Sequence, residues 1–103
     1  MARILAQPDE TVTAIAAALE EFEDQYPGTE CALYRYNPGA VRVRVVSPIF
    51  EGVSKRERQN IVMKTLRKLP GDTRYDISIM LCLAPGETSM MDVEFEEPVP
   101  TDM

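Results

Sequence analysis

The residues with the clearest potential for chemistry are cations in the stretch SPIFEGVSKRERQNIV, residues 47–62. Lys55, Arg56 and Arg58 all fall within four positions of Ser54. A helix is predicted to begin here, and a helix N-terminus already carries about half a positive charge, so cations at this end are electrostatically disfavoured. They indicate either an anionic partner or a solvated face whose long side-chain stems cover apolar surface.

Several common chemistries are missing from the chain. It contains no histidine, which removes the Ser–His and Cys–His dyads, the usual zinc sites and the usual general base near neutral pH. Cys31 and Cys82 lie among apolar residues without metal-site spacing, so they are predicted to be small buried hydrophobes kept reduced. Paired carboxylates form no acid–base constellation either. We therefore expect no enzyme activity, no cofactor or metal of its own and no small-molecule substrate.

Charge is strongly polarised along the chain. The net charge is −6, which argues against general attraction to nucleic acid. Residues 42–74, however, hold nine basic and three acidic side chains, whereas the rest of the chain holds two basic and fourteen acidic ones. This distribution predicts a molecule with one basic face and one acidic face.

The first element that must position these residues is a helix over residues 10–25. Asp9 is its expected N-cap, and Pro27-Gly28 ends it. Its apolar stripe recurs at three- and four-residue spacing and consists of Val12, Ile15, Ala16, Leu19, Phe22 and Tyr26.

A hairpin is predicted next, with strands over 30–36 and 40–46 joined by Asn37-Pro38-Gly39. Proline followed by glycine at the two central positions is typical of a type II turn. In the second strand valines alternate with Arg42 and Arg44, which predicts one buried face and one cationic, solvated face.

A second helix is predicted over about 55–69. Ser54 and Glu57 have the spacing of a capping box, and Pro70-Gly71 ends the helix. Its core stripe consists of Val62, Leu66 and Leu69, flanked by Ile61 and Thr65. The opposite side carries Arg56, Asn60, Lys64 and Arg67.

A third strand is predicted within YDISIMLCLAP, residues 75–85. The connection from the second strand contains a helix and is long enough for a crossover, so these strands should be parallel. The expected fold class is α+β, a two-layer sandwich with two helices on a mixed three-stranded sheet. Residues 91–96 alternate apolar and acidic positions and could be an extra C-terminal edge strand or a frayed acidic tail.

The predicted organisation is an N-terminal extension (1–8), one domain (9–88) and an acidic C-terminal segment (89–103). The start of the chain, MARILAQPDE, lacks the features of a signal peptide, and no apolar run is long enough to cross a membrane. The expected location is therefore cytoplasmic.

Five residues between the second strand and the second helix form a recognisable pattern: Phe50, Gly52, Ser54, Arg58 and Val62. With the strand ISIMLCLAPGE, this pattern over about residues 40–88 resembles the BolA-like proteins. The resemblance implies an α-β-β-α-α-β fold akin to the class II KH domain. It also implies pairing with a monothiol glutaredoxin across a shared [2Fe–2S] cluster, or nucleic-acid binding and transcriptional control in stress response and cell shape.

The chain departs from this family where the cluster would be held. Gln59 stands at the position of the family's ligating histidine, and an amide is a poor ligand for cluster iron. The family's second ligand, a Cys or His, should fall near residues 36–40, where neither residue type occurs. Phe50, Gly52 and Ser54 are interpreted as mainly structural, as a core plug, a tight turn and a helix cap.

Two functions remain open. The first is a non-enzymatic BolA-like module that acts through a protein partner, such as a monothiol glutaredoxin, without its own cluster ligand. The alternative is a KH-like nucleic-acid-binding regulator that uses the basic face of helix 55–69. The predicted contact residues are Arg42, Arg44, Lys55, Arg56, Arg58, Gln59, Lys64 and Arg67.

Overall fold

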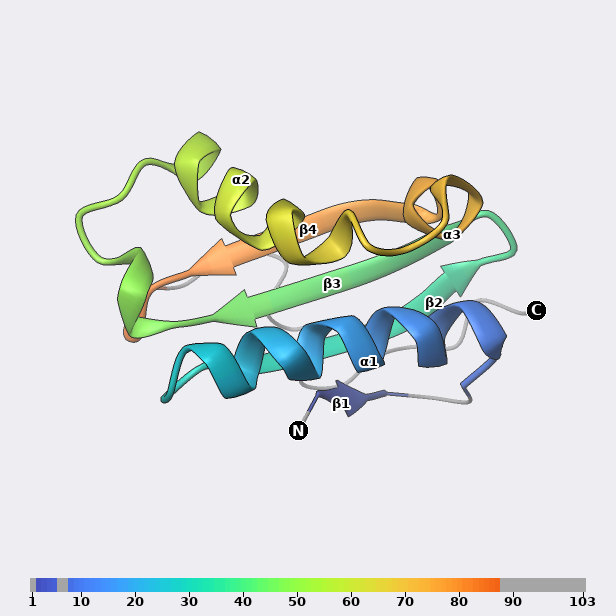
Figure 1. The fold of residues 1–103 in the computed structure, drawn as a ribbon, viewed down its shortest axis with the longest axis horizontal. Helices are drawn as coiled ribbons and strands as arrows, with labels where there is room; N and C mark the ends of the chain where they lie inside the picture. The colour runs from blue at the N-terminus through green and yellow to red at the C-terminus, as the bar shows by residue number, and fades with distance from the viewer. Residues whose placement is uncertain (1, 6–7, 88–103) are drawn as a thin grey trace.

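The structure, a computed structural model, describes residues 2–5 and 8–87. Its elements, in chain order, are β1 (Arg3–Ile4), α1 (Glu10–Gln25), β2 (Glu30–Asn37), β3 (Ala40–Val46), the 3-10 helix η1 (Pro48–Phe50), α2 (Lys55–Leu66), α3 (Gly71–Tyr75) and β4 (Ile77–Leu83). They form an α+β domain with a mixed four-stranded sheet and three helices (Figure 1). The prediction of an edge strand or tail at 91–96 lies outside the described residues.

The sheet has the strand order β1-β2-β3-β4. Strands β2 and β3 are antiparallel, as the hairpin prediction required, with Leu33 opposite Val43. Strand β4 runs parallel to β3, with Val43 opposite Met80, so the predicted crossover is confirmed. Figure 1 shows α1 running along the sheet in front of β2, while α2 and α3 lie alongside β4. Helix α2 is therefore held at one edge of the sheet.

The predicted strand count was wrong by one. Strand β1 lies within the segment interpreted as an N-terminal extension, and it pairs in parallel with β2 through Arg3 opposite Ala32. The backbone N–H of Leu5 extends this pairing by donating to the oxygen of Leu33 over 2.9 Å. A strand of two residues is too short to show alternation, so its pattern could not be read from the sequence.

The helix boundaries were predicted closely at one helix and less closely at the other. Helix α1 spans the predicted residues, and the Asp9 carboxylate accepts a hydrogen bond from the N–H of Val12 over 2.8 Å, as an N-cap does. Helix α2 ends at Leu66, three residues before the predicted end. The short helix α3 then follows Pro70 and leads into β4.

The hairpin turn is not the predicted type II turn. That turn needs a positive φ at its second central residue, here Gly39, and this glycine does not adopt one. Instead the side-chain oxygen of Asn37 accepts a hydrogen bond from the N–H of Gly39 over 3.0 Å. Asparagine thus closes the turn through its own side chain, which removes the need for the left-handed conformation.

One apolar core fills the space between the helices and the sheet. It includes Phe22 from α1, Val62 and Leu66 from α2, and three of the four valines of β3, all with no exposed surface. Strand β4 contributes Met80 and Cys82 to this core. The other face of the sheet carries a small second cluster around Ala32 and Tyr34.

Candidate functional site

The segment between β3 and α2 fixes where the cationic helix begins. Phe50 is fully buried, and its ring lies against that of Phe22 at a centroid distance of 6.4 Å. Gly52 adopts φ +74°, a conformation that favours glycine. The hydroxyl oxygen of Ser54 then accepts a hydrogen bond from the N–H of Glu57 over 3.2 Å and caps α2. Phe50 thus lies in the core, Gly52 lies in the turn and Ser54 caps the helix.

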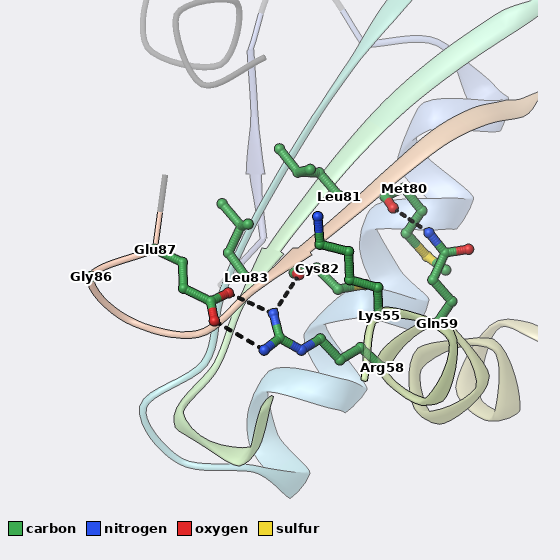
Figure 2. Close-up of a pocket in the computed structure, with 9 residues that line it drawn as sticks. All are labelled: Lys55, Arg58, Gln59, Met80, Leu81, Cys82, Leu83, Gly86 and Glu87. Carbon is green, nitrogen blue, oxygen red and sulfur yellow. Dashed lines mark hydrogen bonds and ion pairs between the residues drawn. The ribbon is translucent and has the colours of Figure 1, made fainter. Parts of the chain in front are cut away.

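An open groove of about 560 Å³ lies between α2 and β4 (Figure 2). From the helix it is lined by Lys55, Arg58 and Gln59, which share one side of α2 because they are three and four residues apart. The strand and the loop after it provide Met80, Leu81, Cys82, Leu83, Gly86 and Glu87. The groove therefore combines positive charge, main-chain groups of an edge strand and apolar side chains.

Arg58 is the buried centre of this groove, with 5% of its surface exposed. Its Nε donates to the oxygen of Val53 over 2.8 Å, and Nη1 donates to the oxygen of Cys82 over 3.1 Å. Nη1 and Nη2 also bind the two carboxylate oxygens of Glu87 at 2.5 and 3.0 Å. Arg58 was predicted to be a contact residue on an exposed basic surface, but the structure buries it in an ion pair.

Glu87 closes the groove from the loop after β4. One of its carboxylate oxygens also accepts the N–H of Ala84 over 2.9 Å. The hydrogen bonds from Arg58, and next the one from Ala84, lower the pKa of Glu87 from 4.5 to about 2. The same pairing raises the pKa of Arg58 above its ordinary value. Both groups are therefore charged across the physiological range.

The side-chain amide of Gln59 contacts strand β4. Its Nε2 donates a hydrogen bond to the main-chain oxygen of Met80 over 2.8 Å (Figure 2). With the bond from Arg58 to Cys82, side chains of α2 cover two main-chain oxygens of β4, which is an outer strand of the sheet within the described residues. The position at which the family resemblance places a histidine thus serves here to cover a sheet edge.

These residues do not fit the iron–sulfur cluster that the resemblance implies. Gln59 presents an amide whose nitrogen is already engaged with Met80. The thiol of Cys82 is buried, and that burial raises its pKa to about 12, so it is protonated rather than a ready thiolate ligand. Within residues 2–5 and 8–87, no cluster of three or more His, Cys, Asp or Glu side chains is placed to hold a metal.

The remaining cations of α2, and Arg67 at its C-cap, are at the surface. Lys55, Arg56, Lys64 and Arg67 are all exposed. Just beyond them Lys68 forms an exposed ion pair with Glu21 of α1 at 3.1 Å. The predicted basic side of this helix therefore exists, but without Arg58.

Arg42 and Arg44 lie on the other face of the sheet. They are half-buried and alternate with valines that face the helices. The guanidinium of Arg42 lies 3.5 Å from the ring centroid of Tyr36, and its Nη1 donates to the hydroxyl of Tyr34 over 3.3 Å. The predicted contact residues are thus divided between two surfaces, one on α2 and one on the helix-free face of the sheet.

Sequence reasoning missed Glu87 as a site residue. It stands in APGE, the ending of the last strand segment, and the sequence carries no signal that places it opposite the cationic helix. Sequence reasoning also missed the main-chain oxygens of Met80 and Cys82 as groups of the site. No sequence pattern indicates which strand lies at an edge of the sheet.

Comparisons with known proteins assign no family: no protein-family model, no curated protein and no solved structure matches this chain. Among the described helices, none is both long and apolar enough to cross a membrane.

Proposed function

We propose that this protein is a non-enzymatic, BolA-like binding module that acts through a protein partner and supplies no iron–sulfur ligand. The order of the elements after β1 supports this proposal, since α1-β2-β3-α2-α3-β4 is the order that the resemblance implies. The roles of Phe50, Gly52 and Ser54 support it too, because they explain why this pattern precedes a helix.

The observation that carries the proposal is the position of α2. The helix lies along the outer strand β4, exposes Lys55, Arg56, Lys64 and Arg67, and borders an open groove (Figures 1 and 2). Lys55 and Arg56 lie in its first turn, where each cation costs about 0.3–1 kcal/mol at low salt. An acidic partner surface would offset that cost. Mixed polar and apolar lining, with large side chains bordering a groove, is typical of protein interfaces.

Nucleic-acid binding is the second candidate. The observation that favours it is Arg42 stacked on Tyr36, because stacked aromatic and arginine side chains bind unpaired bases. Against it stands the division of the basic residues: Arg42 and Arg44 lie on the face of the sheet opposite the helices. A partner that contacts α2 alone needs no such division.

The test is co-expression of the full chain with a monothiol glutaredoxin, followed by size-exclusion chromatography and visible absorbance. We expect a colourless complex, because Gln59 is no ligand for iron. The variant Gln59→His should gain visible absorbance in the complex if this side chain is what excludes the cluster. A brown complex of the unmodified chain would contradict the metal-free proposal, and absence of any complex would contradict the choice of partner.

Charge reversal identifies the contact surface. Lys64→Glu combined with Arg67→Glu should weaken the complex by about tenfold or more, because like charges then meet across the interface. The matched control is Arg3→Glu, an exposed cation on β1 at the opposite edge of the sheet, which should leave the affinity unchanged. Salt dependence separates the two candidates, since binding through several phosphates falls steeply as ionic strength rises.

A further inference from the structure

We infer that the groove between α2 and β4 is a carboxylate-binding site, which Glu87 occupies in the isolated protein and an acidic segment of a protein partner takes over. The inference rests on the proposed function in one respect, since it gives the chemistry of the partner's contact. Its test uses a synthetic peptide, so that it can fail independently.

The first argument is that Arg58 is held in place without Glu87. Its Nε and Nη1 donate to the main-chain oxygens of Val53 and Cys82, which belong to the turn before α2 and to β4. The planar guanidinium is therefore fixed by the fold, and its outer edge points at the groove (Figure 2). A fixed arginine fork binds a carboxylate through two parallel hydrogen bonds.

The second argument is that this guanidinium favours an anionic partner. The Arg58 side chain is 7% exposed, so water reaches little of its charge. A buried charge that loses its partner is strongly destabilising. Exchange of Glu87 for another carboxylate breaks one ion pair and forms another, so the charge of Arg58 keeps an anionic partner.

The third argument is that Glu87 is placed to be exchanged. Its side chain is 42% exposed, in contrast to that of Arg58. It follows Gly86, which adopts φ +89° with open space around the position of a Cβ, so the loop is not packed against the domain at this point. Apart from Arg58, its carboxylate is held only by the N–H of Ala84 among the described contacts.

The fourth argument concerns the size and chemistry of the groove. About 560 Å³ is more than one carboxylate needs, and Lys55 lines the same space as Arg58 from one turn earlier on α2. Leu81 and Leu83 add apolar side chains to the lining. Two cations a turn apart beside an apolar strand suit a peptide with neighbouring acidic residues better than a single small anion.

The test measures binding of fluorescein-labelled hexaglutamate to the full chain by fluorescence anisotropy at low salt and neutral pH. Glu87→Gln keeps the shape of the side chain and removes the competing charge, so we expect this variant to bind about tenfold more tightly than the unmodified protein. Glu87→Ala should gain at least as much. Adding Lys55→Ala to Glu87→Gln should reverse part of the gain.

The matched control is Glu51→Gln, which changes the net charge equally at an exposed residue outside the groove lining. It should leave the affinity within about twofold, because Glu51 is not part of the groove lining and its removal frees no partner of Arg58. Thermal melting of each variant verifies that it is folded. Hexaglutamine serves as the uncharged probe and should not bind.

Three results would overturn the inference. Equal affinity of Glu87→Gln, Glu87→Ala and the unmodified chain for hexaglutamate would show that Glu87 does not compete with the peptide for a binding site. An equal gain in Glu51→Gln would reduce the effect to net charge. An equal gain for oligothymidine would assign the groove to phosphate instead of carboxylate. None of these results depends on whether a glutaredoxin binds, so the proposed function and this inference stand or fall separately.

Discussion

The side-chain amide of Gln59 donates a hydrogen bond to the main-chain oxygen of Met80 over 2.8 Å, from helix α2 to the outer strand β4. One position earlier in the chain Arg58 does the same for Cys82 over 3.1 Å. Unpaired main-chain groups of an outer strand attract strands of other molecules. Two adjacent side chains of one helix thus cover alternate main-chain oxygens of this edge.

Replacing Gln59 with Leu should weaken this cover. The lost hydrogen bond predicts a decrease of about 0.5–1.5 kcal/mol in the free energy of unfolding, measured by urea denaturation. The uncovered oxygen of Met80 should also raise self-association at high concentration, measured by light scattering. The matched control is Asn60→Leu, an exposed position with the same gain of apolar surface. Equal behaviour of the two variants would contradict the role given to Gln59.

The ion pair of Glu87 with Arg58 predicts a specific acid sensitivity. Because the pKa of Glu87 falls from 4.5 to about 2 on folding, its contribution to stability is fully present above about pH 4.5 and is lost as pH falls toward 2. The melting temperatures of the unmodified chain and Glu87→Gln should therefore differ near neutral pH and converge near pH 2.

Asp9 provides the background for that comparison. A hydrogen bond from Arg35 lowers the pKa of Asp9 as well. The contribution of Asp9 to stability is therefore also lost as pH falls, and by the same amount in the unmodified chain and in Glu87→Gln. The difference between the two melting curves then reports Glu87 alone. A constant difference down to pH 2 would contradict the predicted titration.

Gly52 and Gly39 differ in backbone conformation, so replacing each with alanine should have different effects on stability. Gly52 has φ +74° and open space around the position of a Cβ, so Gly52→Ala should cost about 1–2 kcal/mol from the backbone conformation alone. Gly39 has no positive φ, and a Cβ there would meet only the Asn37 oxygen at 4.0 Å. Gly39→Ala should be neutral or slightly stabilising. Urea denaturation of both variants checks this order, and equal losses would contradict it.

The two cysteines should be unreactive while the protein is folded. Burial raises the pKa of both Cys31 and Cys82 to about 12, and the thiolate is the form that reacts with disulfide reagents. At about pH 8 we expect no colour from the reagent DTNB in native buffer and reaction of both thiols in denaturant. Fast reaction of the native protein would show that one of them is accessible.

The elements with strong periodicity were predictable from the sequence. Helix α1 shows its apolar stripe over four turns, and Val41, Val43 and Val45 of β3 alternate with arginines, so their boundaries and buried faces were predicted correctly. The parallel placement of β4 followed from the length of the crossover. Each of these conclusions depends on repeated local signals that agree with one another.

The site was less predictable because it depends on contacts between distant residues. Arg58 and Glu87 are 29 positions apart, and the sequence does not indicate that they meet. An arginine on a helix is usually exposed, so its burial follows only from the position of α2 against β4. The short strand β1 and the side-chain closure of the Asn37 turn were missed for a related reason, since each involves too few residues to form a pattern.

The connections between strands bear on how the domain folds. Strands β2 and β3 form a hairpin, whereas β1 joins β2 only across α1, and β4 joins β3 only across α2 and α3. Both outer strands must close a long loop before they gain any pairing, which slows their addition. The hairpin should therefore assemble early and keep its amide protons longest in hydrogen exchange, while the strand that lines the groove is added late.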